Sequence, residues 1–315
     1  AVHAGVCKGR WVAFVTSLNI SSLFTESGLT QNWVRIEVIG MSFDGAGLNG
    51  LDYDVCEYDG SRLMFRGPKI DVDKPYVAFL GATETFGKFV AQPFPTVLTK
   101  HLPAQSLNLG MINAGVDAYL GDPAIVDLAK KADLRVVQVL SALNQSNHFF
   151  KVHPRRNDRF IGASEALVRM YPEVDFTEFH FTKAMLVALH DCSERRFKIL
   201  CCELQQIWLK RMSQLLKYIG SPTVLVWFAG AEPPKNGLRD PKDPMLVDAK
   251  MIEKIRGEAS AYVLCVPDET ALAQDNEELL RIMASPVAAS QIMGPKAHLQ
   301  AAQTLQEICT DLMRK

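Results

Sequence analysis

Three polar loops in this 315-residue chain directly follow short hydrophobic runs. These loops are Gly81–Gly87, Asn108–Gly115 and Ser141–Asn147. They carry hydroxyl, amide and carboxyl side chains, and glycines whose backbone N–H groups are able to face a ligand. Such groups hold polar ligands and stabilise developing negative charge. We expect ligand contacts from Glu84, Thr85, Asn113 and Asn147. A purely structural interpretation, in which the side chains cap helices, stays open.

A second group of reactive or ligand-binding residue types is the basic run Lys151–Arg159. Guanidinium groups match the geometry of phosphate, sulfate and carboxylate, so the run predicts recognition of an anion. The expected contacts are His153, Arg155, Arg156 and Arg159. An equally open alternative is a solvated turn in which Asp158 and Glu165 neutralise the arginines. No aromatic stripe accompanies the run, which argues against a nucleic-acid partner.

Composition excludes several classes of protein. The 34 Lys and Arg residues against 35 Asp and Glu give a net charge of −1, which argues against a polyanion-binding protein. Hydrophobic residues at 48% and charged residues at 22% are typical of a globular chain. No apolar run approaches the ~18 residues of a membrane span, so we expect no membrane partner. The seven cysteines form no Cys-x-x-Cys pair, which favours a reducing, cytoplasmic compartment.

Two further motifs do not have the spacing that a phosphate-binding loop or a metal site requires. Gly81–Lys88 is similar to a phosphate-binding P-loop, but it has five residues between its glycines instead of four. Asp175, Glu178 and His180 have a spacing that fits no common metal site. The sequence therefore predicts no cofactor and no metal.

The elements that position these loops are short strands alternating with helices. The expected strands are Tyr76–Leu80, Ser106–Leu109, Arg135–Leu140, Thr223–Phe228 and Ala261–Val266. The expected helices are Phe86–Leu102, Pro123–Lys131, Ser164–Tyr171, Thr177–Asp191, Arg195–Ile219, Leu246–Gly257, Asp275–Ala284 and Lys296–Met313. Strands that are apolar almost throughout are typical of a parallel sheet buried on both faces. The pattern predicts an α/β three-layer sandwich with a five-stranded parallel sheet of flavodoxin type.

The strand order decides whether the polar loops meet. In the order 2-1-3-4-5, the loops after the first and third strands face each other across a crevice at the carboxyl ends of the strands. The long connection 141–222 exceeds one crossover helix, so we expect a helical insertion or lid there. Its helix Arg195–Ile219 carries an apolar stripe at helical spacing. That stripe predicts either core packing or an interface for a homo-oligomer.

The first forty residues differ from the rest of the chain. Lys8 and Arg10 precede the apolar stretch Trp11–Val15, but polar residues interrupt it and no signal-cleavage site follows. We interpret residues 1–40 as a doubtful extension and expect the native start at Met41. Residues 41–315 are then a single α/β domain.

The loop sequences resemble the SGNH hydrolase superfamily, whose conserved blocks occur in this order on a flavodoxin-like sheet. Phe79–Thr85, Asn108–Gly115, Val139–Asn147 and Gly294–His298 are similar to its four blocks. Three positions depart from the family pattern. Ala82 replaces the aspartate that follows the first glycine, Thr83 replaces the nucleophilic serine, and Pro295 replaces the aspartate before the histidine.

The resemblance implies a set of catalytic roles. Thr83 would be the nucleophile, His298 the base, and the Gly115 N–H with Asn144 the oxyanion hole. The implied function is that of an esterase or acyltransferase acting on an anionic small molecule or sugar ester. The alternative is a non-catalytic anion- or carbohydrate-binding protein with a degenerate site. An oligomeric scaffold built through the Arg195–Ile219 stripe is also open. For His298 alone, the alternative is an ordinary residue at a helix N-terminus.

A closer resemblance covers residues 41–315. The stretches Leu63–Pro68, Tyr76–Pro95, Asn108–Asp117, Val152–Phe160 and Tyr171–Phe176 are similar to an uncharacterised bacterial family, domain of unknown function 6473. This resemblance implies no activity.

Overall fold

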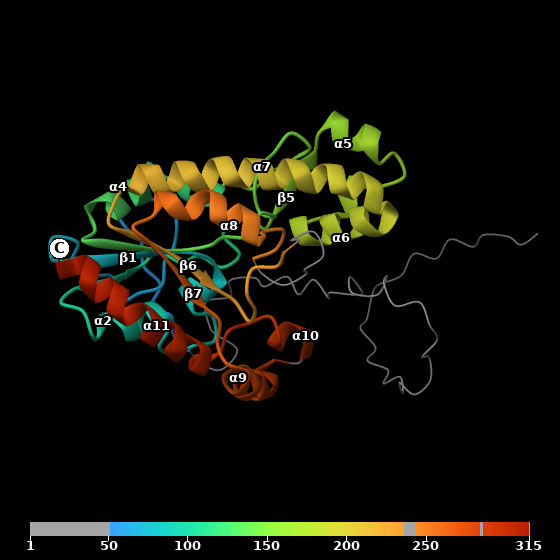
Figure 1. Ribbon diagram of the computed structural model, residues 1–315. Helices are drawn as coiled ribbons and strands as arrows, with labels where there is room; N and C mark the ends of the chain where they lie inside the picture. The colour runs from blue at the N-terminus through green and yellow to red at the C-terminus, as the bar shows by residue number, and fades with distance from the viewer. Residues whose placement is uncertain (1–50, 236–243, 284–285, 315) are drawn as a thin grey trace, which may run out of the picture. The chain divides into compact units, whose positions relative to one another are not determined.

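A five-stranded parallel sheet lies at the centre of the fold (Figure 1). The computed structural model describes residues 51–235, 244–283 and 286–314, so the predictions for residues 1–40 lie outside the described residues. The strands are β1 (Tyr76–Leu80), β2 (Gln105–Asn108), β3 (Leu134–Gln138), β6 (Thr223–Phe228) and β7 (Ala261–Cys265). Their order β2-β1-β3-β6-β7 confirms the predicted 2-1-3-4-5 arrangement. The predicted α/β fold class and parallel sheet are therefore confirmed.

Helices cover both faces of this sheet, which makes three layers. Along β1, Val77 and Phe79 point into one core while Ala78 and Leu80 point into the other, because side chains alternate along a strand. Figure 1 shows α4, α7 and α8 over one face and α2 and α11 over the other. The helices of these layers are α2 (Phe94–Thr99), α3 (Val116–Leu120), α4 (Pro123–Lys131), α7 (Glu194–Ile219), α8 (Ala249–Ile255) and α11 (Pro295–Arg314).

The remaining elements are short, or belong to the connections between the strands. They are α1 (Thr83–Phe86), β4 (Phe150–Val152), β5 (Phe160–Ala163), α5 (Glu165–Met170), η1 (Phe176–Glu178), α6 (Thr182–Cys192), η3 (Arg256–Glu258), α9 (Glu269–Ile282) and α10 (Pro286–Ala289). The prediction of one helix over Phe86–Leu102 is wrong. Gly87 (φ 75°) and Phe89 (φ 65°) leave the helical conformation after α1, and Pro93 forms the N-cap of α2.

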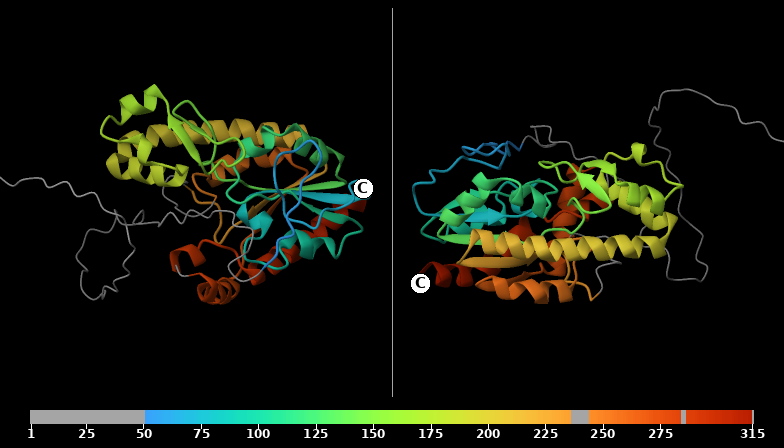
Figure 2. Two further views of the ribbon diagram at one scale, coloured as in Figure 1. Left: turned by 180° about the vertical axis from the view of Figure 1, so that it is seen from behind. Right: turned by 90° about the horizontal axis from the view of Figure 1, so that it is seen from above.

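The long connection between β3 and β6 combines an insertion with a crossover helix. Its first part holds the antiparallel hairpin of β4 and β5, followed by α5 and α6. Figures 1 and 2 show α5 and α6 grouped at one end of α7. The rest of α7 packs on the sheet layer, where the indole N–H of Trp208 donates to the Leu140 carbonyl at 2.8 Å. Part of the segment predicted as a lid is therefore the crossover helix itself.

The apolar stripe of α7 lies inside the chain's own core. Its buried members are Phe197, Leu200, Leu204, Trp208, Met212, Leu215 and Ile219. Only Ile207 of the predicted stripe is half-buried instead of buried. The stripe therefore packs in the core, which is one of the two interpretations that the sequence allows, and a homo-oligomer through Arg195–Ile219 stays a prediction.

Two expectations drawn from composition concern the cysteines, which we expect to be reduced, and the helices, none of which we expect to span a membrane. The six cysteines of the described ranges are all free thiols, three of them buried: Cys201, Cys265 and Cys309. Burial raises the pKa of each of these three thiols to about 12. No helix within the described residues has both the length and the apolar character to cross a membrane.

Candidate functional site

The loop after β1 is held by Gln138 at the carboxyl end of β3. The Gln138 side-chain oxygen accepts from the Ala82 N–H (3.0 Å) and from the Thr85 hydroxyl (2.6 Å). Its Nε2 donates to a Glu84 carboxylate oxygen at 2.7 Å. Gly81 has no room for a side chain, because a Cβ there would lie 2.0 Å from the Thr85 Oγ1. Thr85 is therefore a buried structural residue, although the sequence predicted a ligand contact.

Three of the predicted polar residues meet at this edge of the sheet. The Asn113 N–H donates to the Thr83 Oγ1 at 3.1 Å, and the Thr83 hydroxyl donates to the Asn113 Oδ1 at 3.3 Å. The Asn144 Nδ2 donates to the Asn113 carbonyl at 2.9 Å. Asn113 adopts the left-handed conformation (φ 56°), which asparagine tolerates better than most residues. Thr83, Asn113 and Asn144 are thus brought together, with their polar groups bonded to one another.

Gly115 joins the same cluster, but its N–H already has a partner. The N–H groups of Gly115 and Ala118 both donate to the Asn157 Oδ1, at 3.1 and 2.9 Å. A Cβ at Gly115 would lie 1.7 Å from the Asn144 carbonyl oxygen, so only glycine fits. In this structure the N–H that the resemblance assigns to the oxyanion hole donates instead to Asn157, whose Oδ1 accepts at the start of α3.

His298 does not lie with Thr83. It is 1% exposed in the core beneath the sheet, with ring centroids 6.0 Å from Phe94 and 5.2 Å from Phe228. The Nδ1 accepts from the Phe94 N–H at 3.0 Å. Burial lowers the pKa of His298 to about 3, so the ring stays neutral. His298 is thus a buried ring whose Nδ1 already accepts a backbone N–H, and no hydrogen bond to Thr83 is found within the described residues.

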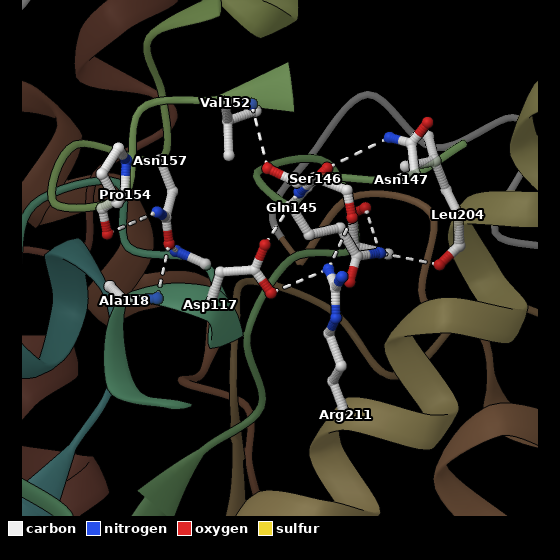
Figure 3. Close-up of polar contacts among 12 residues, drawn as sticks. Asp117, Ala118, Gln145, Ser146, Asn147, Val152, Pro154, Asn157, Leu204 and Arg211 are labelled. Atoms are coloured by element: carbon white, nitrogen blue, oxygen red, sulfur yellow. Dashed lines mark hydrogen bonds and ion pairs between the residues drawn. The ribbon is translucent and has the colours of Figure 1, made fainter. Parts of the chain in front are cut away.

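The loop after β3 is fastened by polar contacts to α3 and α7 (Figure 3). Arg211 of α7 lies 2.7 Å from an Asp117 carboxylate oxygen and donates to the Ser146 carbonyl at 2.7 Å. The Ser146 N–H donates to the other Asp117 oxygen at 2.8 Å. Burial raises the pKa of Asp117, and the Arg211 guanidinium opposes this shift. These contacts attach the insertion to the sheet edge.

Asn147 closes the turn that leads into β4. Its Oδ1 accepts from the N–H groups of Phe149 (2.8 Å) and Phe150 (3.1 Å), and its Nδ2 donates to the Gln145 carbonyl. Each polar atom of the side chain is engaged within the turn. The expected ligand contact at Asn147 is therefore a turn-forming contact in the structure.

The basic run forms the loop between β4 and β5. The His153 Nδ1 accepts from the N–H groups of Arg155 and Arg156, both at 3.2 Å. The Asn157 Nδ2 donates to the carbonyls of His153 (3.0 Å) and Pro154 (3.3 Å), as Figure 3 shows for Pro154. Since Asn157 also binds the start of α3, a single buried side chain joins the basic loop to the sheet edge.

A cavity of about 420 Å³ lies against this loop; we call it the cationic cavity. It is lined by Arg62, Leu63, Met64, Phe86, Met111, Ile112, His153, Arg155, Arg156 and Asp158. Arg159 is not among these residues; its guanidinium stacks 4.4 Å from the centroid of the Phe181 ring. The structure thus brings His153, Arg155 and Arg156 together around one cavity and places Arg159 elsewhere.

Glu84 lines a different cavity, of about 270 Å³, at the carboxyl end of β6. Its other lining residues include Phe228, Asn276 and Met293. No group of three His, Cys, Asp or Glu side chains in the described ranges gathers as metal ligands would. Asp175, from the rejected metal motif, instead accepts from the Thr177 N–H at the start of η1.

Three residues of this region are not predicted from the sequence. Gln138 had a signal, because it is the one polar residue in the run Val136–Leu140. Asn157 lay unassigned within the basic run. Arg62 carried no signal, since only the fold brings it beside the loop that contains Arg155.

Three solved structures are similar to this chain at low identity. The lipase Lip_vut3 from a goat rumen metagenome is 12% identical (TM-score 0.40), with 75% of this chain and 98% of that chain covered. A variant of Axe2, an acetyl-xylooligosaccharide esterase from Geobacillus, is 13% identical (TM-score 0.36; 74% and 94%). BT4096, a gut microbial diltiazem-metabolizing enzyme, is 13% identical (TM-score 0.34; 74% and 46%). Similarity of this degree says nothing about the activity of this chain.

Sequence families give a clearer result. Comparison with curated proteins finds no relative. The family described as Domain of unknown function (DUF6473) matches residues 41–313, which is most of the chain. The match contains the sheet, the polar loops and the cationic cavity. This chain therefore belongs to the DUF6473 family.

Proposed function

We propose that this protein binds a small anionic ligand in the cationic cavity. The observation that carries the proposal is the convergence of Arg62, Arg155 and Arg156 on one cavity. The cavity volume of about 420 Å³ lies within the usual range for small-molecule sites. Guanidinium groups recognise oxyanions through paired, charge-assisted hydrogen bonds.

The charge balance of the cavity supports an anion as ligand. Asp158 is the one carboxylate among the lining residues, and it lies 3.6 Å from Arg156. Neither Arg62 nor Arg155 has an ion-pair partner in the part of the chain that the structure describes. The lining therefore has two positive charges in excess.

Binding explains the arrangement around Thr83 better than esterase or acyltransferase activity does. Covalent catalysis needs a base that accepts the Thr83 proton, and the partner of this hydroxyl is the amide of Asn113. The expected base, His298, is enclosed in the core. The expected oxyanion donor, Gly115, is bonded to Asn157. We therefore favour the non-catalytic alternative for this family member.

Titration calorimetry with sulfate and inorganic phosphate tests the anion site. We expect saturable binding that weakens about tenfold or more in Arg62→Ala and in Arg155→Ala, because each loses a charged hydrogen-bond donor. Arg195→Ala is the matched control: Arg195 is exposed at the start of α7 and does not line the cavity. Equal affinities in all four proteins would refute the site.

A short-chain aryl ester distinguishes binding from catalysis. We expect wild type, Thr83→Ala and His298→Ala to leave the ester at its uncatalysed rate. Turnover by the wild type that Thr83→Ala abolishes would restore the hydrolase interpretation.

A further inference from the structure

The cationic cavity is much larger than an inorganic anion requires. Its volume is about 420 Å³, whereas one water molecule occupies about 30 Å³ in the liquid. A tetrahedral oxyanion has only five heavy atoms, so it fills a small part of this space. The remaining volume has room for an organic substituent.

The same cavity also has an apolar wall. It consists of Leu63, Met64, Phe86, Met111 and Ile112. Phe86 and Leu63 are nearly fully buried, whereas Met64 is 42% exposed. Methionine side chains adapt to ligands of different shape, and apolar area removed from water stabilises a complex. The wall therefore suits an apolar or aromatic group attached to the anion.

The charge of the lining narrows the class of anion. Three guanidinium groups and one carboxylate leave two positive charges in excess. A phosphate monoester carries close to two negative charges above pH 7, because its second pKa is about 6. A sulfate monoester or a carboxylate carries one, which leaves one guanidinium without a partner.

We infer that the ligand is a phosphate monoester with an apolar substituent, bound with the phosphoryl group at the arginines and the substituent on the apolar wall. This inference rests on the proposed anion-binding function, and it adds the chemical class of the ligand. The two parts of the ligand meet two separate sets of side chains, so each set is testable by itself.

Titration calorimetry at pH 8 with inorganic phosphate, phenyl phosphate and phenyl sulfate tests the inference. Phenyl phosphate is expected to bind about 10- to 100-fold more tightly than inorganic phosphate, since burial of the ring adds the apolar contribution. Phenyl sulfate is expected to bind more weakly than phenyl phosphate. The double variant Met64→Ser with Ile112→Ser is expected to lose about tenfold in affinity for phenyl phosphate and to keep that for inorganic phosphate within twofold. Val168→Ser, at an exposed position of α5, is the control and should change neither affinity.

The outcomes separate this inference from the function on which it rests. Saturable binding of both phosphates with equal affinity overturns the inference and leaves the anion site intact. A wild-type protein that binds neither phosphate overturns both the inference and the anion site. Phenyl sulfate that binds as tightly as phenyl phosphate, or more tightly, overturns the assignment of a dianion. Circular dichroism shows whether the double variant is folded. If it is not, the single variant Met64→Ser replaces it, because the Met64 side chain is partly exposed. A folded variant that binds phenyl phosphate as tightly as the wild type contradicts the role of the apolar wall.

Discussion

His298 illustrates at the scale of one residue how burial decides chemistry. The neighbouring sequence Gly294–His298 suggested a catalytic base, yet the ring is stacked against Phe94 in the core and its Nδ1 accepts a backbone N–H. Removing the imidazolium from water is costly, so the neutral form is the one that the fold accommodates. In the folded protein this side chain therefore serves as an acceptor for the Phe94 N–H.

The depressed pKa of His298 predicts a dependence of stability on pH. Since the folded-state pKa is about 3 and an unfolded histidine titrates near 6.5, the unfolded chain binds the extra proton between these values. The stabilisation is complete above pH 6.5 and is lost as the pH falls toward 3. We expect the free energy of unfolding to fall by up to about 1.4 kcal/mol per pH unit from this group.

Urea unfolding of wild type and His298→Asn between pH 7 and 4 measures this effect. Asparagine keeps a side-chain acceptor for the Phe94 N–H but does not titrate, so the variant should lose this part of the pH slope. Parallel slopes in the two proteins would contradict the assignment.

At the scale of elements, Asn157 joins the basic loop to the start of α3. Replacing it with alanine removes four hydrogen bonds. The Gly115 N–H then loses its acceptor, and the Ala118 N–H keeps only its 3.3 Å contact with the Gly115 carbonyl. We expect Asn157→Ala to reduce the free energy of unfolding by roughly 2–5 kcal/mol and to weaken phosphate binding, because the arginines lose their fixed position.

Chemical unfolding and phosphate titration check the two effects separately. Asn157→Asp keeps the acceptor for the two N–H groups but loses both donated bonds, so its stability should lie between those of alanine and wild type. Wild-type stability and affinity in Asn157→Ala would show that the loop is held by other contacts.

The close approach of Gly115 to the loop after β3 gives a further prediction at this scale. A Cβ would lie 1.7 Å from the Asn144 carbonyl oxygen, so Gly115→Ala must displace backbone. We expect a destabilisation of about 3 kcal/mol, measured by urea unfolding. Gly162→Ala is the matched control, because no atom lies within 4 Å of its added Cβ, and it should change stability by less than about 0.5 kcal/mol. A similar loss in both variants would show that the close approach is not what Gly115 provides.

At the scale of the whole molecule, the near-neutral charge argues against attraction of a polyanion. The chain has a net charge of −1, and the lining of the cationic cavity holds three arginines against one carboxylate. Polyanion binding depends on many basic groups that together displace counterions. We expect no retardation of duplex DNA or single-stranded RNA in a mobility-shift assay at 100 mM salt. A discrete complex at micromolar protein would contradict this expectation.

The local sequence determined the layers of this fold, and the contacts between distant segments decided its candidate site. Apolar runs such as Val224–Phe228 predicted buried parallel strands, and the polar loops were correctly placed at the strand ends, because burial and periodicity are local properties. Only the packing of distant segments pairs the Gly115 N–H with Asn157 and buries His298 in the core. The same packing brings Arg62 and Arg155 to one cavity. Each of these outcomes depends on which segments pack together, and a pattern of residue types within one segment does not contain that information.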